Sequence, residues 1–472
     1  MNMQLSKREF LKRLGLLGAA GATGAALGDE YVPDNSKLPP GSCGDPKNVW
    51  FGRHIFPLEH TQTDGPSCFA KDGRVFEPAK EIPIFHQTDV VVVGGGPAGF
   101  AAALGAARAG AKVALIERYG SLGGLFTNGM VLIMLATSRR EESGKWTLVT
   151  RGVCGEFMER VGKFGKDFSS MPTDATPKRH WQPTVDPEAA KYLMDEMIVE
   201  NKNIDIFYHA WGVDVIQDGD KVLGVVFESK EGRQAILAKQ VVDCTGDADM
   251  LFKAGGDYKQ ITSSITTVFR WANMDTINPP PGSNSKLPRR GNEGNPDANW
   301  GGASMNTGNP ISIRDLTRVE ISQRKLNWER VMKMRATPGW EKVYTSNSAS
   351  QIGIRGSRLI DAEFIMGRKE IFEGYDKSDT VGWCGHDGAH AAFPFVYRQL
   401  LPKKIDNLLC AGRCLGKGDT IDTFRLICPC FATCQAAGVA AALAALKGVA
   451  PRALAYSDLK RELLNQNVFL NG

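Results

Sequence analysis

The chain lacks several features that would assign it to common protein classes. It holds 57 basic and 52 acidic residues, a net charge of +5, and its lysines and arginines form no long block. Nucleic acid is therefore not expected as a partner. No apolar run after the first 28 residues reaches the length of a membrane span, so no transmembrane span is expected in the mature chain. There is no internal repeat and no second Gly-x-Gly-x-x-Gly segment, which argues against a separate nicotinamide-binding domain.

The ten cysteines also lack the spacing of a metal centre. Five of them lie between residues 410 and 434, and they match neither C-x-x-C nor the ferredoxin patterns. We therefore predict no metal and interpret them as small apolar packing residues, with an iron–sulfur cluster or redox disulfide as the alternative. In an exported protein, Cys43 and Cys68 could form a disulfide, because both lie in a Pro/Gly-rich segment with little core of its own.

The N-terminus is typical of an export signal. Residues 6–12 are charged, residues 14–27 are weakly apolar, and small residues follow near Ala25. Such a segment is too short for a stable membrane span. It resembles a twin-arginine signal in which Lys7 replaces the first arginine, so we expect a periplasmic or secreted protein. The alternative is an amphipathic N-terminal helix.

The pattern of apolar residues predicts an α/β fold. A valine strand over 89–93, an alanine-rich helix over 97–109 and a strand over 112–117 make one βαβ unit with a parallel sheet. Strand-like segments between residues 204 and 242 suggest an antiparallel meander. Further predictions are helices over 187–201, 312–334 and 432–446, a strand over 407–411 and a long loop over 279–310.

The turn after the valine strand predicts a dinucleotide site. Residues 94–99 fit Gly-x-Gly-x-x-Gly between a strand and a helix, and the next strand ends in Glu117, about 20 residues on. Glycines allow the tight turn, the approach of a pyrophosphate and close helix–strand packing, while the helix N-terminus supplies oriented N–H groups. Glu117 can accept hydrogen bonds from ribose hydroxyls and would repel a 2′-phosphate. The alternative is a glycine turn in an ordinary α/β protein.

Three further segments resemble FAD-dependent oxidoreductases of the two-dinucleotide-binding-domain type, an exported bacterial group distantly similar to the fumarate reductase and succinate dehydrogenase flavoproteins. They are residues 117–127, 242–249 and 407–414, with Arg425 and residues 435–438 following in the expected order. The resemblance implies FAD as cofactor. Together with the turn, it assigns cofactor binding to Gly94, Gly96, Pro97, Ala98, Gly99, Glu117, Arg118, Gly123, Gly124, Thr127, Val213, Thr245, Gly246, Asp247, Gly412 and Arg413.

The resemblance also implies a divided architecture. We expect a Rossmann-like FAD-binding domain with a central parallel sheet and a β-meander, plus an inserted α+β substrate or cap lobe. The predicted parts are an export signal (1–28), an irregular leader (29–87), the first FAD segment (88–150), a cap segment (151–200), the second FAD segment (201–258), the substrate lobe (259–400), the third FAD segment (401–450) and a tail (451–472).

Groups that could act on a substrate lie in the lobe and beside the last flavin strand. Arg355, His386 and Arg425 are the predicted catalytic residues, and Arg358 and His390 are further candidates. A guanidinium can bind a carboxylate or stabilise an oxyanion, and a histidine can take a hydroxyl proton. The alternative for each arginine is a structural ion pair, and for each histidine an ordinary polar loop residue. Gly356 stands where the family usually has a glutamate.

These features predict an enzyme that transfers a hydride between flavin N5 and a small polar substrate, either a sugar-like alcohol or an unsaturated carboxylate. The alternative is a flavin-containing electron-transfer or binding subunit that acts with a partner protein. The sequence identifies no particular substrate, because fold does not fix function.

Overall fold

The computed structural model describes residues 68–170, 183–273, 298–302, 306–386, 392–418 and 422–470, which belong to one compact unit over residues 62–472. The predicted export signal lies outside the described residues, as do Cys43 and His390. The proposed Cys43–Cys68 disulfide therefore stays a prediction.

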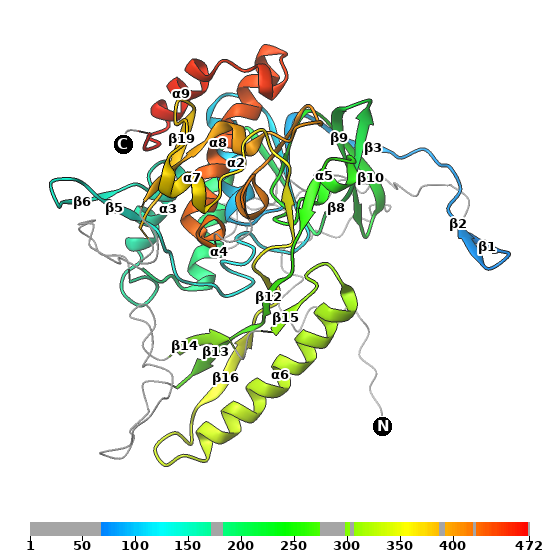
Figure 1. The fold of residues 1–472 in the computed structure, drawn as a ribbon. Helices are drawn as coiled ribbons and strands as arrows, with labels where there is room; N and C mark the ends of the chain where they lie inside the picture. The colour runs from blue at the N-terminus through cyan, green and yellow to red at the C-terminus, as the bar shows by residue number, and fades with distance from the viewer. Residues whose placement is uncertain are drawn as a thin grey trace, which may run out of the picture. The chain divides into compact units, whose positions relative to one another are not determined.

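The core of the unit is a seven-stranded sheet in the order β7-β4-β3-β10-β9-β8, with β21 beside β10 (Figure 1). Five strands pair in parallel, and β9 and β8 are added at one side through antiparallel pairs, β10 with β9 and β9 with β8. This arrangement confirms the α/β class with a parallel sheet and a meander. The strands are β3 (Ile84–Val93), β4 (Val113–Glu117), β7 (Ile204–Tyr208), β8 (Trp211–Asp218), β9 (Lys221–Ser229), β10 (Gly232–Asp243) and β21 (Leu408–Cys410).

The predicted meander includes one strand that belongs elsewhere in the sheet. β8, β9 and β10 form it, but β7 instead pairs parallel with β4. The reason is the connection, because β7 follows the helix α4 (Pro187–Val199), and a helical crossover returns the chain in parallel. The predicted start of α4 is confirmed: Asp186 accepts hydrogen bonds from the backbone N–H groups of Glu188 and Ala189.

Two helices pack closely against each other through glycines. A Cβ atom on Gly105 of α2 (Pro97–Arg108) would lie 2.7 Å from the carbonyl oxygen of Gln435, and one on Gly438 would lie 2.0 Å from that of Ala102. The small-residue helix α8 (Ile427–Lys447) begins five residues earlier than predicted, because Pro429 falls in its first turn, where no N–H is required.

Among the described residues, α8 alone is long and apolar enough to cross a membrane. Within the fold, however, 89% of its most apolar window is buried, as in the core helix of a globular domain.

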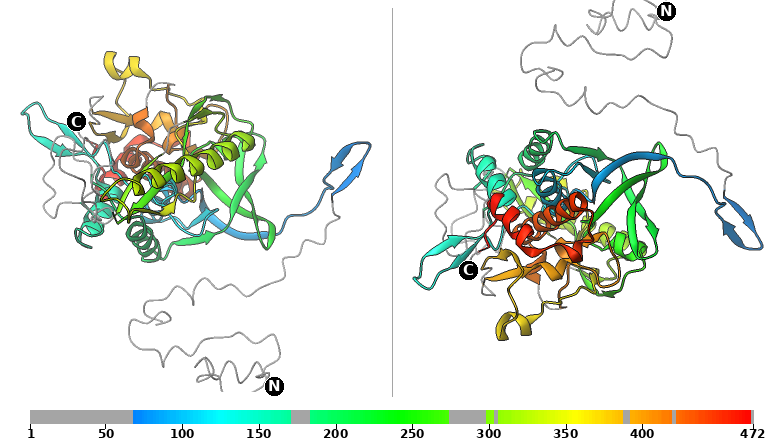
Figure 2. Two further views of the ribbon diagram at one scale, coloured as in Figure 1. Left: turned by 90° about the horizontal axis from the view of Figure 1, so that it is seen from below. Right: turned by 90° about the horizontal axis from the view of Figure 1, so that it is seen from above.

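The leader is not irregular up to residue 87. Strands β1 (Phe69–Lys71) and β2 (Arg74–Phe76) form a hairpin, and β3 begins at residue 84 (Figure 2). Asp72 and Gly73 both have positive φ, which matches the Asp-Gly hairpin turn. The early part of β3 is ordered by tertiary contacts, since Phe85 packs against Phe207 and Phe227.

The inserted lobe contains a small sheet, β14-β13-β16, and the long helix α6 (Ile313–Arg335). Ser312 caps α6 by accepting from the N–H of Asp315, which confirms the predicted start. The predicted loop over 279–310 is wrong where it is described, because it contains β14 and β15. The strands of the lobe are β12 (Ser263–Thr266), β13 (Val268–Ala272), β14 (Ala298–Gly302), β15 (Asn306–Gly308), β16 (Tyr344–Ser348) and β17 (Gly353–Ile354).

The remaining elements surround these two parts. They are the strands β5 (Ser138–Arg140), β6 (Trp146–Leu148), β11 (Tyr258–Gln260), β18 (Arg358–Ile360), β19 (Thr380–Cys384) and β20 (Phe393–Val396), the helices α3 (Gly152–Gly162), α5 (Asp249–Lys253), α7 (Arg368–Glu373) and α9 (Tyr456–Asn465), and the short 3-10 helices η3 (Tyr397–Leu400), η4 (Gly412–Cys414), η5 (Asp422–Arg425) and η6 (Pro451–Ala453).

Candidate active site

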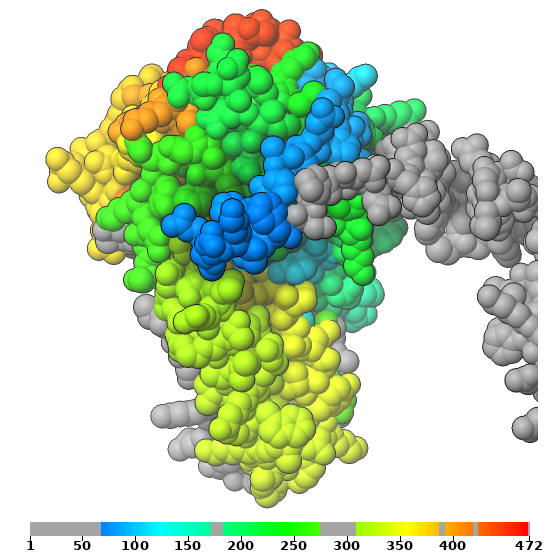
Figure 3. Space-filling view, turned by 90° about the vertical axis from the view of Figure 1, so that its right-hand side faces the viewer, coloured from blue at the N-terminus to red at the C-terminus, as the bar shows by residue number. Residues whose placement is uncertain are grey.

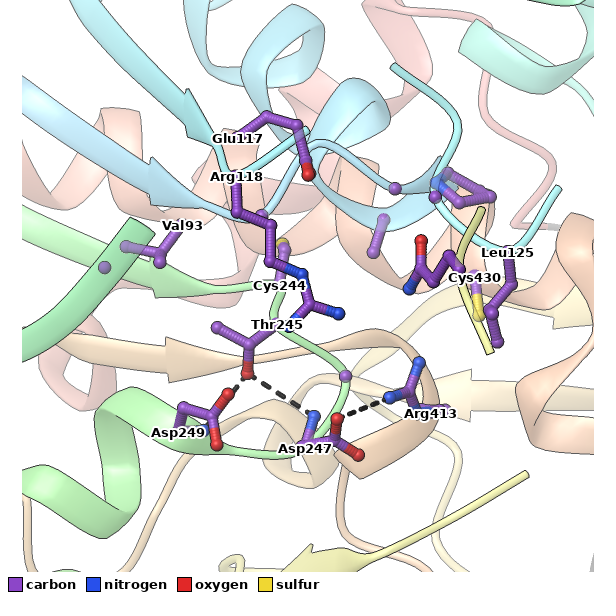
Figure 4. Close-up of a pocket in the computed structure, with 18 of the residues that line it drawn as sticks. Val93, Glu117, Arg118, Leu125, Cys244, Thr245, Asp247, Asp249, Arg413 and Cys430 are labelled. Atoms are coloured by element: carbon purple, nitrogen blue, oxygen red, sulfur yellow. Dashed lines mark hydrogen bonds and ion pairs between the residues drawn. The ribbon is translucent and has the colours of Figure 1, made fainter. Parts of the chain in front are cut away.

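A cavity lies at the carboxyl end of the parallel strands (Figure 4). It encloses about 880 Å³ of space, including the part open to solvent. Val93 of β3, Ile116 of β4 and Cys244 after β10 line it. Ligands of open α/β sheets bind at this position, outside the carboxyl ends of the strands.

The first turn of α2 borders the cavity and offers it free N–H groups. Gly96 is the N-cap and has no side chain to cap the helix, and Gly96, Pro97 and Ala98 all line the cavity. The nearest atom to a Cβ on Gly96, beyond its neighbours in the chain, would be the Gly124 Cα at 3.9 Å, so a Cβ would fit beside this backbone. The helix N-terminus thus presents a polar, positive edge suited to a phosphate.

The other two motif glycines act through packing. Gly94 lines the cavity with a φ of +100°, a conformation that favours glycine. Gly99 does not line it, but a Cβ there would lie 1.7 Å from the Gly94 carbonyl oxygen. Gly99 therefore holds the helix against the turn.

Glu117 lies buried beside this turn. Its Oε2 accepts a hydrogen bond of 2.5 Å from the N–H of Gly95, and its Oε1 accepts one of 2.8 Å from the N–H of Tyr119. Burial raises the pKa of Glu117 above that of an ordinary glutamate, although these two N–H groups oppose the shift. Each carboxylate oxygen keeps a second lone pair for a hydroxyl donor.

An aromatic residue that the sequence reasoning missed stands at the same end. Trp211, at the start of β8, lines the cavity and is 56% exposed, and the guanidinium of Arg118 lies 5.9 Å from its ring centre. Ala210 and Gly212 also line the cavity, whereas the predicted Val213 does not. Its exposure and its place at the cavity follow from the tertiary structure, so no local pattern in the sequence marks it.

The later part of the segment 117–127 both lines the cavity and fixes the turn beside it. Gly124 lines the cavity, while Gly123 and Thr127 do not. Thr127 donates a hydrogen bond to the Leu122 carbonyl, and a Cβ on Gly123 would lie 2.4 Å from the Thr127 side chain. These two residues therefore close the turn that places Gly124.

The segment after β10 forms the opposite wall. Thr245, Gly246 and Asp247 line the cavity. The segment is held by Asp243, which is fully buried and accepts from the N–H groups of Thr245 and Met250. Burial raises the pKa of Asp243 to about 6.

An ion pair ties this wall to the last flavin strand predicted from the sequence. Arg413 lies 2.7 Å from Asp247, with both side chains largely buried (Figure 4). Arg413 lines the cavity, whereas Gly412 does not. A Cβ on Gly412 would lie 3.2 Å from the Cβ of Ala98, so this glycine brings the strand end against α2.

Two residues that follow Arg355 in the lobe, Ser357 and Arg358, hold the same wall in place. Ser357 donates a hydrogen bond to the Asp247 carboxylate, and Arg358 pairs with Asp249 at 2.7 Å. Arg358 is thus a structural ion-pair residue. Arg355 does not line the cavity.

Two arginines and the N-terminal end of α8 lie at the end of the cavity away from Glu117. Arg425, Ile427 and Cys430 line it at the start of α8, and the N-cap Leu426 offers no side-chain cap. Burial raises the pKa of Cys430 to about 12, although Arg413 and Arg425 oppose the shift, so this thiol stays protonated at neutral pH. We name this region, defined by Arg413, Arg425 and the first turn of α8, the cationic end.

The predicted catalytic His386 is not part of the cavity lining. His386 donates its backbone N–H to the Ser138 carbonyl at 2.7 Å, and its ring meets the edge of Trp146. It does not line the cavity, and His390 lies outside the described residues. In the part of the chain that is described, no group of three or more His, Cys, Asp or Glu residues could hold a metal ion.

Two buried polar atoms of the lining have no hydrogen-bond partner among the described residues. They are Oε1 of Gln351, a lobe residue that the sequence reasoning missed, and Nε of Arg413. Orphaned buried polar atoms indicate a ligand that satisfies them. An acceptor on Gln351, a donor on Arg413 and uncapped helix ends fit a cofactor with a polar ring system and a pyrophosphate.

Comparison with known proteins agrees with this geometry. The sequence model of the family described as FAD dependent oxidoreductase matches residues 89–276 and 260–463. A dihydrolipoyl dehydrogenase of Trypanosoma brucei brucei is 56% identical over 46 residues, a match that spans 10% of this chain and 10% of that protein.

Two solved structures were found to be similar over most of the chain. A geranylgeranyl bacteriochlorophyll reductase-like protein from Thermoplasma acidophilum is 15% identical, with a TM-score of 0.38, covering 81% of this chain and 82% of that one. The p-nitrophenol 4-monooxygenase PnpA from Pseudomonas putida is 13% identical, with a TM-score of 0.40, covering 82% and 86%.

The family match extends over most of the chain, including the strand ends and helix starts that line the cavity. The chain belongs to the FAD-dependent oxidoreductase family and is an enzyme that uses FAD.

Proposed function

We propose that the enzyme oxidises or reduces a small polar substrate that carries a carboxylate, with an unsaturated carboxylate as the first candidate. The observation that carries this proposal is the contrast between two predicted catalytic residues. Arg425 lines the cavity, whereas His386 does not. A guanidinium at the site suits a carboxylate, while oxidation of an alcohol requires a base that can take its proton.

The lining divides the cavity between cofactor and substrate. Glu117 and Trp211 would hold the adenosine part of FAD, and the start of α2 would hold its pyrophosphate. Bound FAD supplies the hydride chemistry. The remaining end, beside Arg425 and the start of α8, is where we place the substrate.

The cationic end would bind and orient an anion. Arg413 is held in place by Asp247, so its charge is partly balanced within the protein. Arg425 and the positive end of α8 add to the potential there. A carboxylate bound at this point would be fixed beside the cofactor, and the closely packed wall around it would exclude water.

Two alternatives have distinct requirements. A sugar-like alcohol substrate would need a base, and His386 would have to reach the cavity. An electron-transfer subunit would use the cavity for FAD alone and exchange electrons with a partner protein.

We also propose that the protein is exported, because its N-terminus resembles an export signal. Fractionation of cells that produce the full chain tests this proposal. An uncleaved chain in the cytoplasm would contradict it.

Purified protein loaded with FAD tests the proposal. Under anaerobic conditions, unsaturated carboxylates are added to the reduced enzyme, and sugar-like alcohols to the oxidised enzyme, while the flavin absorbance is followed. We expect an unsaturated carboxylate to reoxidise the flavin and Arg425→Met to lower kcat/KM about 10–100-fold, since hydrogen bonds to charged groups contribute about 1.5–3 kcal/mol. Arg368→Met, on the exposed face of α7, is the matched control and should leave the rate unchanged.

His386→Gln separates the candidates. The alcohol candidate would replace the carboxylate proposal if the enzyme turned over alcohols alone. In that case His386→Gln would lower kcat/KM strongly and Arg425→Met would leave it unchanged. No turnover in either direction, together with flavin reduction by an added protein donor, would favour the electron-transfer alternative.

A further inference from the structure

The helix α6 has an apolar outer face. Ile321, Trp328 and Met332 are 61%, 65% and 48% exposed. They are spaced by seven and four residues, so they lie along one side of the helix. Figure 3 shows the α6 lobe, in yellow-green, as an exposed surface. Exposed large apolar side chains gathered on one face indicate an interaction site.

Specific hydrogen bonds fix this orientation of the helix. On the inner side, the buried amide of Gln323 accepts from the N–H of Thr267 and donates to the carbonyl of Ile265. One turn later, Asn327 accepts from the indole N–H of Trp271 at 3.0 Å. Rotation of α6 to bury the apolar face would break these bonds and leave buried polar groups unpaired. The exposure of Trp328 is therefore built into the lobe.

The same helix carries an excess of positive charge. Its sequence contains seven basic and three acidic residues, a net charge of +4. Each acidic residue has a basic neighbour within the helix: Arg318 for Asp315, Arg324 for Glu320 and Lys325 for Glu329. The excess cations would repel the same face of a second copy and attract an anionic surface.

We propose that the outer face of α6 docks on an anionic lipid bilayer. A basic helix face with a central tryptophan suits the membrane interface, where the indole and the aliphatic side chains enter the headgroup region and the cations contact the lipid charges. The outer side of a helix is convex, and a bilayer accepts it without a matching groove, whereas a protein partner would need one. The inference is independent of the substrate assignment.

Vesicle sedimentation with the full-length, FAD-loaded protein tests it. We expect binding to vesicles that contain phosphatidylglycerol, weak binding to pure phosphatidylcholine, and loss of binding at high salt. Trp328→Ser combined with Ile321→Ser should lower the bound fraction about tenfold or more. Phe372→Ser is the matched control, since Phe372 of α7 is 68% exposed outside this face.

Flavin content and the circular dichroism spectrum show whether the variants remain folded. Failure of the wild-type protein to bind either vesicle, or equal binding by the double variant, would overturn the proposal. A dimer in solution that requires Trp328 would also overturn it, by assigning this face to a second copy.

Discussion

The two ends of the cavity are built in different ways. The end beside Glu117 comes mainly from one contiguous βαβ unit, to which the start of β8 adds Trp211, and its polar groups are mainly backbone N–H groups. The cationic end is assembled from segments far apart in the chain, because Arg413 is paired with Asp247 and lies beside the start of α8. The first end depends on backbone conformation, and the second depends on side-chain pairing across the fold.

This difference indicates where each end is vulnerable. A backbone site tolerates side-chain changes but no added volume at its glycines, because the chain approaches itself closely there. A site of paired side chains tolerates small volume changes but loses its geometry when one partner is removed. The substitutions below separate these two kinds of dependence.

The largest effect is expected for Gly99→Ala. Its new Cβ would lie 1.7 Å from the carbonyl oxygen of Gly94, which is backbone and cannot yield without moving the turn. Because backbone and not a side chain must move, the loss of unfolding free energy should exceed the value of about 1–3 kcal/mol that is typical of overpacking, and also the loss expected for Asp247→Ala. Chemical denaturation of the FAD-free protein measures it.

Gly96→Ala is the matched control for this prediction. Gly96 has an extended conformation that alanine can adopt, and its Cβ would meet no protein atom closer than 3.9 Å. We expect unchanged stability without FAD but weaker FAD binding, because the methyl group enters the cavity. Equal destabilisation by both substitutions would show that the two glycines do not differ in role.

An intermediate effect is expected at the cationic end for Asp247→Ala. Removing this carboxylate leaves the largely buried Arg413 guanidinium unpaired, which costs about 3–5 kcal/mol of unfolding free energy for a buried pair. Thermal and chemical denaturation check the loss. Glu159→Ala, which breaks the exposed pair with Lys163, should cause no resolvable change. A similar effect of both would contradict a structural role for the Asp247–Arg413 pair.

The smallest effect concerns the pH dependence of the Glu117 end. Because burial raises the pKa of Glu117, its carboxyl group becomes protonated at a higher pH than an ordinary glutamate. FAD affinity should therefore weaken as the pH falls through this raised pKa. The contribution of Glu117 to the free energy of unfolding without FAD has the opposite sign: it falls as the pH rises between the ordinary and the raised pKa.

Glu117→Gln should flatten both profiles and lower FAD affinity roughly tenfold or more, since a charged acceptor is lost. Flavin fluorescence titrations between acidic and neutral pH measure the affinity. A variant that keeps the wild-type pH profile would assign the titration to another group.

The sequence predicted the parts that are local. The glycine turn, the helix after it and the caps at Asp186 and Ser312 were read correctly, because each depends on residues within one or two turns. The hairpin of β1 and β2 carried an Asp-Gly signal that was overlooked. Trp211 and Gln351 were missed, since neither belongs to a motif and only their tertiary position brings them to the cavity.

By itself, the sequence determined the α/β class and the nucleotide-binding turn, because backbone geometry and helix ends follow from residues that are neighbours in the chain. FAD as the cofactor was implied by the resemblance of further segments to a flavoprotein family. Only the tertiary structure decided which charged side chains share the cavity. It placed Arg425 in the lining and left Arg355 and His386 out of it. It also turned Trp328 outward, because the buried amides of α6 pair with strands more than 50 residues away. Such long-range pairing depends on packing and carries no local signature.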